Sequence, residues 1–285
     1  VEKPRYTLAE LAELVVDVDG WIASMDKVDR SVLQAGRRLQ VISRFGVGVD
    51  FIDLQAAQDL GIVITNTPQV NANSVAEHTV GLILALMRKI AEGSQAVRSG
   101  AWRIIPSPTL QGKVLGLLGF GQIGQAVARR MAGFDMRILA FDPLPDRQTA
   151  RDLGVELVCQ AELVSQADVL SLHLPLTAQT IGMVNSVFLA QMKAGAYLIN
   201  TARGDLVDEE AVYQALERRH LAGAALDVMS VEPVLPGHPL LSFPTVLITP
   251  HMAGYGESAI NAMGSNALHN LLCVLRGEEP PHRVV

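Results

Sequence analysis

The chain has 285 residues, of which 49% are hydrophobic and 18% are charged, and its formal net charge is −6. This composition is that of a globular protein with a substantial core, and the length allows two domains. The charge is acidic and no run of basic residues is longer than a pair. These features argue against nucleic-acid binding and favour a small soluble ligand.

Neither a membrane segment nor a metal site is indicated. No apolar stretch approaches the ~20 residues that a membrane-spanning helix needs. The first residues carry no signal-peptide pattern. The two cysteines, Cys159 and Cys273, are far apart and lack the spacing of metal ligands. We therefore expect a cytoplasmic protein without a structural metal.

Two patterns open the chain, a helical one at 6–14 and then a strand-like run at 20–24. A domain built on a parallel sheet normally opens with a strand. We therefore expect a further strand and its connection, about 30 residues by the size of a βαβ unit, to precede Val1.

Strand-like apolar runs then alternate with helical patterns to the end of the chain. Such alternation is typical of βαβ units, which form a parallel sheet with helices on both faces. The runs lack the polar–apolar alternation of a half-exposed strand, as expected when both faces are covered. They occupy residues 40–45, 62–66, 113–119, 136–142, 167–174, 196–200, 222–228 and 245–250.

Residues 73–100 predict one long helix, about twice the usual ~11–12 residues. Its central part, 80–87, is apolar nearly all round. A helix without a polar face must be buried, here between domains or between subunits.

Two domain boundaries follow from this pattern, one near Pro68 and the other near Gly254–Gly256. The chain ends, residues 1–68 and 256–285, are predicted to form one split α/β domain. The middle, residues 69–255, is predicted to form a doubly wound parallel-sheet domain that binds a dinucleotide.

A GxGxxG motif, Gly119, Gly121 and Gly124, directly follows a strand-like run and opens a helical pattern. In dinucleotide-binding folds the first glycine permits the tight turn, the second lets the backbone approach a pyrophosphate, and the third lets helix pack on strand. The phosphates then lie on the helix N-terminus, against the backbone of Gln122 and Ile123. A glycine-rich turn without a ligand is the alternative interpretation.

Asp142 ends the next strand-like run, about 20 residues downstream, where a carboxylate accepts the ribose hydroxyls of NAD. The alternative is a helix-capping or turn aspartate before Pro143. An acidic group at this position repels a 2′-phosphate, so we predict NAD(H) rather than NADP(H), although Arg147 is close in sequence.

Three chemically capable residues, Arg203, Glu232 and His251, each come just after one of the later strand-like runs. Open α/β sheets bind their ligands outside the carboxyl ends of their strands. Taken singly, each could be an exposed loop residue. Together they predict a catalytic site beside the cofactor.

The chain resembles the D-isomer-specific 2-hydroxyacid dehydrogenase family from residue 20 to its C-terminus. The resemblance implies an NAD-binding domain, a smaller flavodoxin-like α/β substrate domain split between the chain ends, and a homodimer with the long helix near the subunit contact. It rests on the ordered motifs RFGVGVDFID, NSVAEHTVGLILAL, GFGQIG, LHLPLT, NTARGDLVDEE, GAALDVMSVEP and TPHMAG.

The reaction implied is reduction of a 2-keto acid, which needs a hydride, a proton and a cation for the carboxylate. His251 is the candidate acid and base, and Glu232 would bind its other ring nitrogen and favour the charged imidazolium. Arg203 would donate hydrogen bonds to both the carboxylate and the carbonyl oxygen. The backbone amides of Val47 and Gly48, in the other domain, would hold the carboxylate from its far side.

The resemblance also adds residues around the nicotinamide. Asp227 faces its carboxamide in relatives, with Thr201 and Ala202 beside it, and Gly254 is assigned to the same cofactor site. The histidines His78 and His173 we interpret as core or helix-packing residues, and Arg44 as a salt-bridge partner within its own domain rather than a ligand of the substrate. A different class of function, an NADH-sensing corepressor-like protein with little turnover, would have no need of the three catalytic candidates together.

Overall fold

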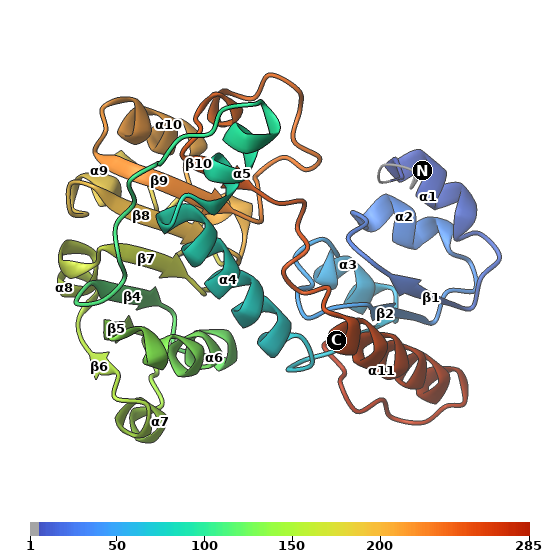
Figure 1. Cartoon of the computed structure of the whole chain (residues 1–285). Coiled ribbons are helices and arrows are strands. Elements are labelled where there is room, and N and C mark those ends of the chain that lie inside the picture. Colours follow the sequence, from blue (N-terminus) through green and yellow to red (C-terminus); the bar gives the residue numbers. More distant parts are fainter. Residues whose placement is uncertain (1–5) are drawn as a thin grey trace. The chain divides into compact units, whose positions relative to one another are not determined.

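The computed structural model describes residues 6–285 and separates them into two compact units (Figure 1). One unit is formed by the chain up to Asn71 together with Gly254–Val285, and the other by Ala72–Ala253. From the sequence we placed these boundaries after residues 68 and 255. The two units are called below the split unit and the central unit.

The central unit is built on a parallel sheet of seven strands in the order β10-β9-β8-β7-β4-β5-β6. The order reverses between β4 and β7, which makes their carboxyl ends the topological switch point where such sheets bind ligands. The strands are β4 (Val114–Leu118), β5 (Arg137–Phe141), β6 (Glu156–Leu157), β7 (Val169–Leu172), β8 (Ala196–Asn200), β9 (Leu221–Leu226) and β10 (Val246–Ile248).

Helices cover both faces of this sheet, and each face has its own apolar core. One core joins the sheet to α8, α9 and α10, and the other joins it to α4, α6 and α7. Leu115, Leu117 and Leu118 of β4 are all fully buried, which explains why the strands show no polar alternation. The helices are α4 (Ala72–Met87), α5 (Ile90–Arg98), α6 (Gln122–Met131), α7 (Arg147–Asp152), α8 (Gln160–Gln166), α9 (Ser186–Ala190) and α10 (Glu209–Glu217), with 3-10 turns at Ala132–Phe134, Gly204–Leu206 and Pro239–Ser242.

The prediction of one helix over 73–100 is wrong. The structure has two helices, α4 and α5, and Lys89 between them takes a left-handed backbone with φ of 52°. The surroundings change at this point, because α4 is buried along most of its length whereas α5 buries only Ala96. The left-handed residue redirects the chain from the core to the surface.

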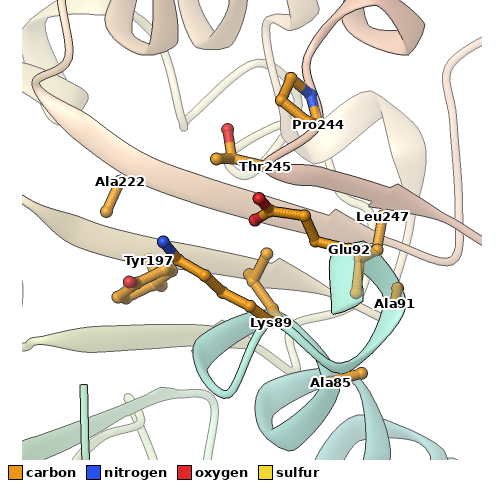
Figure 2. A pocket seen from close by; sticks show the side chains of 10 residues that line it. Ala85, Lys89, Ala91, Glu92, Tyr197, Ala222, Pro244, Thr245 and Leu247 are labelled. Atoms are coloured by element: carbon orange, nitrogen blue, oxygen red, sulfur yellow. The ribbon is translucent and has the colours of Figure 1, made fainter. Parts of the chain in front are cut away.

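A small cavity lies where α4 gives way to α5 (Figure 2). Figure 2 shows Lys89 and Glu92 on one side of it and Tyr197, Ala222 and Thr245 on the other. Its volume is about 20 Å³, which is room for a single water molecule. Since Tyr197 and Ala222 lie near the amino ends of β8 and β9, the cavity is at the edge of the sheet opposite to the switch point.

The split unit has a smaller parallel sheet in the order β1-β2-β3. Its strands are β1 (Gly20–Ala23), β2 (Val41–Arg44) and β3 (Val63–Thr65), and its helices are α1 (Leu8–Leu14), α2 (Arg30–Ala35), α3 (Leu54–Asp59) and α11 (Glu257–Leu275). Helix α11 packs against β1, β2 and β3. The C-terminal helix therefore completes a domain begun by the N-terminal residues.

Two short strand pairings, that of β6 with β5 and that of the C-terminal tail with β3, were not predicted from the sequence. Strand β6 has only two residues and begins with an exposed glutamate, so it gives no apolar signal. The C-terminal tail pairs with β3, where Val284 N–H donates to Ile64 O (2.7 Å) and Ile64 N–H donates to Val285 O (3.1 Å).

Candidate functional site

The glycine motif lies at the switch point, directly after β4. Gly119 has φ of 103°, and a Cβ there would come within 2.5 Å of His173 O, which follows β7. A Cβ on Gly124 would come within 2.3 Å of Gly119 O. The first and third glycines are therefore required by close backbone packing alone.

Gly121 differs from the other two glycines, because a Cβ there would meet no atom within 4 Å. It is the N-cap of α6 and supplies no side chain to the backbone N–H groups of the first turn, which include those of Gln122 and Ile123. Such a helix end attracts an anion. An open backbone position beside a positive helix end fits the pyrophosphate of a dinucleotide.

Asp142 follows β5 and lies against the same turn. Its Oδ2 accepts the N–H of Phe120 at 2.8 Å, and its Oδ1 accepts the N–H of Leu144 at 2.9 Å. The second contact is the turn role considered as an alternative, whereas helix α7 is capped by Asp146. A carboxylate oxygen can accept more than one hydrogen bond, so Asp142 retains acceptor capacity for ribose hydroxyls.

His173 lies beneath the glycine turn and is a neutral packing residue at ordinary pH. Its Nε2 is 3.0 Å from the hydroxyl of Ser171, and its Nδ1 is buried without a hydrogen-bond partner. Burial lowers the pKa of His173 to about 4.

Arg203 lies in the loop after β8, which is held closely to its surroundings. Asn200, fully buried at the strand end, accepts the N–H of Ala202 (3.0 Å) and donates to the carbonyl of Arg203 (2.8 Å). A Cβ on Gly204 would come within 2.0 Å of the backbone of Met229. This close approach places the Arg203 loop directly against the loop that follows β9.

His251 and Glu232, on the loops after β10 and β9, are hydrogen-bonded to each other. His251 Nδ1 is 3.0 Å from Glu232 Oε2 and 3.2 Å from Oε1. Glu232 Oε1 also accepts the N–H of Met229 at 3.0 Å. Because a carboxylate only accepts hydrogen bonds, Nδ1 carries the proton and Nε2 is the atom left for a substrate.

The backbone of His251 is left-handed, with φ of 52°, a conformation that costs a non-glycine residue about 1 kcal/mol. Asp227, at the end of β9, holds it there. Its carbonyl accepts the His251 N–H (2.8 Å), and its carboxylate accepts the N–H groups of Met252 (3.0 Å) and Ala253 (2.8 Å).

The Asp227 side chain is 1% exposed and keeps its negative charge. Burial by itself would raise the pKa of Asp227, but the hydrogen bonds from His78, Thr249, Ala253 and Met252 together lower it below its usual value. The site thus contains two carboxyl side chains, Glu232 and Asp227, of which Asp227 is fully buried and ionised.

The turn at Gly46–Gly48 in the split unit presents amide groups. Its three carbonyls are already used: Gly46 O accepts Thr67 N–H (3.0 Å), Val47 O accepts Asn66 Nδ2 (2.8 Å) and Gly48 O accepts Arg44 Nε (2.9 Å). Among the described residues, the amides of Val47 and Gly48 donate no hydrogen bond. Two such amides form a binding position for a carboxylate.

The structure divides the predicted site residues between the units. Gly119, Gly121, Gln122, Ile123, Gly124, Asp142, Thr201, Ala202, Arg203, Asp227, Glu232 and His251 are in the central unit, at the carboxyl ends of its strands. Val47, Gly48 and Gly254 are in the split unit. Thr201 is buried, and its hydroxyl lies 2.9 Å from that of Thr79.

Sequence reasoning missed two polar residues that hold these loops. Asn200 fixes the Arg203 loop, and Thr249 donates to Asp227 Oδ1 at 2.5 Å. Arg44, predicted to be a salt-bridge partner within its own domain, donates to Gly48 O of the amide turn in the same unit. His78 was expected to be a packing residue but lies 3.1 Å from Thr249 Oγ1. The only signal for these residues in the sequence was that each is a polar residue within or directly beside an apolar strand or helix.

Within residues 6–285, no three His, Cys, Asp or Glu side chains come close enough together to hold a metal ion. In the same part of the chain, no helix combines the length and apolar character of a membrane span.

The sequence profile described as "D-isomer specific 2-hydroxyacid dehydrogenase, NAD binding domain" matches residues 80–253. The glyoxylate reductase of Thermofilum pendens is 42% identical over 281 residues, which are 95% of this chain and 83% of that protein. The hydroxypyruvate reductase of Thermotoga maritima is 40% identical over 260 residues, 90% of this chain and 84% of that protein.

A solved structure gives the same result. The crystal structure of a Thermus thermophilus protein superposes with a TM-score of 0.90 at 43% identity, covering 97% of this chain and 89% of that one. The similarity therefore extends over both units and is not confined to the nucleotide-binding sheet.

Proposed function

The chain belongs to the D-isomer specific 2-hydroxyacid dehydrogenase family and is an NAD-dependent enzyme of 2-keto and 2-hydroxy acids, and from this premise we propose that His251 is its acid–base residue. Glu232 is proposed to orient His251, and Arg203 to bind the substrate. The observation that carries the proposal is the contact between His251 Nδ1 and Glu232, which leaves Nε2 to exchange a proton.

His251 gives a proton to the carbonyl oxygen during reduction and takes one back from the hydroxyl during oxidation. NADH, when bound, supplies the hydride that reduces the carbonyl carbon. The substrate carbonyl thus gains a hydride and a proton, and the imidazole is reprotonated from solvent. Glu232 keeps the ring in the tautomer and orientation that this transfer needs, and it stabilises the imidazolium form.

Arg203 supplies the positive charge that the keto acid requires. A guanidinium can donate two parallel hydrogen bonds, so it can bind the carboxylate and polarise the adjacent carbonyl. The amides of Val47 and Gly48, in the split unit, are proposed as further hydrogen-bond donors to the substrate carboxylate. Support for this comes from the three neighbouring carbonyls, which are already hydrogen-bonded and turned to other partners.

The cofactor residues proposed are the glycine turn, Gln122, Ile123 and Asp142, with Thr201, Ala202, Asp227 and Gly254 around the nicotinamide. Gly121 leaves open space where a pyrophosphate would approach. Asp142 carries a negative charge where a 2′-phosphate would be repelled, and this supports NADH as the preferred reductant.

Oxidation of NADH, followed at saturating cofactor with glyoxylate, hydroxypyruvate, pyruvate and phosphohydroxypyruvate, tests the function. We expect turnover with at least one of these 2-keto acids. His251→Asn should lower kcat by at least about a hundredfold, the usual contribution of a general acid, while NADH affinity is retained. NADH binding without turnover on any of the four would favour the sensor-like alternative, and wild-type turnover in His251→Asn would remove His251 from the chemistry.

We also propose that two copies of the chain associate through the segment 90–104. Its side chains Ile90 (57% exposed), Val97 (53%), Trp102 (91%) and Ile104 (95%) are apolar and largely uncovered, an arrangement that marks interaction surfaces. Sedimentation equilibrium of the wild type and of Trp102→Ser/Ile104→Ser tests this. A dimer that becomes a monomer supports the proposal, and a wild-type monomer contradicts it.

A further inference from the structure

Two adjacent residues of α4, His78 and Thr79, contact the two loops that carry the proposed catalytic residues. His78 Nε2 is 3.1 Å from the hydroxyl of Thr249, two residues before His251. The hydroxyl of Thr79 is 2.9 Å from that of Thr201, two residues before Arg203. All of these residues lie within the central unit, so these contacts belong to a single body.

The contacts of His78 have a defined direction. The Thr249 hydroxyl donates to Asp227 Oδ1 at 2.5 Å, and a hydroxyl has a single hydrogen to donate. Thr249 Oγ1 must therefore accept from His78, whose Nε2 carries a proton. His78 Nε2 also lies 3.4 Å from Asp227 Oδ1, so the N–H is directed at an anionic pair of acceptors.

The contacts of Thr79 are directed in the same way. Thr79 Oγ1 donates to the carbonyl of Val75 one helical turn earlier, at 2.7 Å. Its oxygen is thus left to accept the hydrogen of the Thr201 hydroxyl. Thr79 is fully buried and Thr201 is 7% exposed, so neither hydroxyl has water as a ready substitute.

Asp227 connects His78 to the proposed acid–base residue. Its carbonyl and carboxylate bind the N–H groups of His251, Met252 and Ala253 and hold the left-handed backbone of His251 in place. Because the turn is hydrogen-bonded to the Asp227 carboxylate, a change in the orientation of that carboxylate would move the turn. His78 does not contact His251 directly. It acts on His251 through Asp227 and Thr249.

We propose that His78 and Thr79 are positioning residues of the reaction, which together fix the His251 turn and the Arg203 loop to one rigid helix. The inference rests on the roles proposed above for His251 and Arg203. It assigns a function to two polar side chains of α4 that face the loops after β8 and β10.

The first test replaces His78. His78→Phe keeps an aromatic ring at this position and removes the N–H, and we expect kcat to fall at least about tenfold, because small displacements of a catalytic group are costly. The KM for the keto acid should change little. His78→Gln keeps an N–H donor of similar reach and should recover kcat to within about threefold of wild type. Equal kcat in all three proteins, or equal losses in both variants, would overturn the proposal.

A second measurement separates positioning from loss of folding. Adding His78→Phe to the His251→Asn background should cause almost no further loss of kcat, because the residue through which it acts is gone. A full further loss would show a general structural effect and overturn the proposal. If His251→Asn alone had the wild-type kcat, the role proposed for His251 would be wrong. If His251→Asn had a low kcat but His78→Phe had the wild-type kcat, only the present inference would be wrong. Should His78→Phe not fold, His78→Leu replaces it in the same comparison.

Thr79 gives an independent test on the other loop. Thr79→Val removes the hydroxyl at nearly constant volume, and we expect the KM for the keto acid to rise at least about threefold, the effect of one lost hydrogen bond on the Arg203 loop. Thr79→Ser keeps the hydroxyl and should restore the KM. A Thr79→Val enzyme with wild-type KM, or a Thr79→Ser enzyme as impaired as Thr79→Val, would contradict the positioning role.

Discussion

His251 Nδ1 lies 3.0 Å from Glu232 Oε2. The two residues lie in the loops that follow the neighbouring strands β10 and β9, and their side chains are 21% and 16% exposed. The pair is partly shielded from water, so its electrostatic interaction is stronger than that of a surface ion pair. Glu232 is itself held by the N–H of Met229. The imidazole therefore has one occupied nitrogen, one available nitrogen and a fixed orientation.

Replacing Glu232 by Gln should narrow the pH range over which the enzyme reduces its keto acid. The amide still accepts a hydrogen bond from Nδ1, but it no longer stabilises the positive charge of the imidazolium. We expect kcat/KM for reduction to fall off at a lower pH than in the wild type. An unchanged pH profile would argue against the pair. Glu210→Gln, an exposed residue of α10, is the control.

Arg203 should not be replaceable by lysine. Lysine keeps the charge but offers no planar pair of donors, so the paired hydrogen bonds to the carboxylate and the carbonyl oxygen are lost. Arg203→Lys is expected to raise the KM for the keto acid about tenfold and to lower kcat, and Arg203→Gln should be worse in both, consistent with ~1.5–3 kcal/mol for a charge-assisted hydrogen bond. Steady-state kinetics with the best substrate of the panel measure both. Full activity in Arg203→Lys would show that only charge is needed.

Much of this architecture was predictable because its signals are local. The glycine motif after β4 and the unbroken apolar strands define the doubly wound sheet, and the fold class and NAD cofactor inferred from them are confirmed by the topology and by the family profile. The strand-end positions of Arg203, Glu232 and His251 follow from that fold. Parallel strands place their carboxyl ends at one edge, so residues far apart in sequence meet there.

What could not be predicted depends on long-range contacts. No residue in the sequence marks the end of α4, because Lys89 takes a left-handed backbone without being Gly or Asn. Pairing of the C-terminal tail with Ile64 is fixed only in the folded split unit. His78 was interpreted as a packing residue because its partners, Thr249 and Asp227, are about 150 residues or more away in sequence.

Asp142 should control the choice of cofactor. Asp142→Asn keeps an oxygen to accept the N–H of Phe120 but removes the charge that repels a 2′-phosphate. We expect the ratio of kcat/KM for NADPH to that for NADH to rise at least about tenfold, mainly through KM. Asp146→Asn, at the cap of α7 close by in sequence, should leave the ratio unchanged. Comparable kcat/KM for the two cofactors in the wild type would overturn the assignment.

His173 should make the protein less stable in mild acid. Its pKa is lowered by burial from 6.5 to about 4, so between these values the unfolded chain binds a proton that the folded protein does not. The free energy of unfolding should therefore decrease as the pH falls from about 6.5 to about 4, by up to about 1.4 kcal/mol per pH unit. Above this window His173 is neutral in both states and adds no pH dependence.

His173→Gln cannot titrate, so its free energy of unfolding should depend less steeply on pH within that window than that of the wild type. Urea unfolding of both proteins at about pH 7.5 and about pH 5 gives the two slopes. The exposed His269 provides the control, because His269→Gln should keep the wild-type slope. If His173→Gln also kept it, the ring would have to be protonated in the folded protein, and its Nδ1 would need a partner that a buried, unbonded nitrogen does not have.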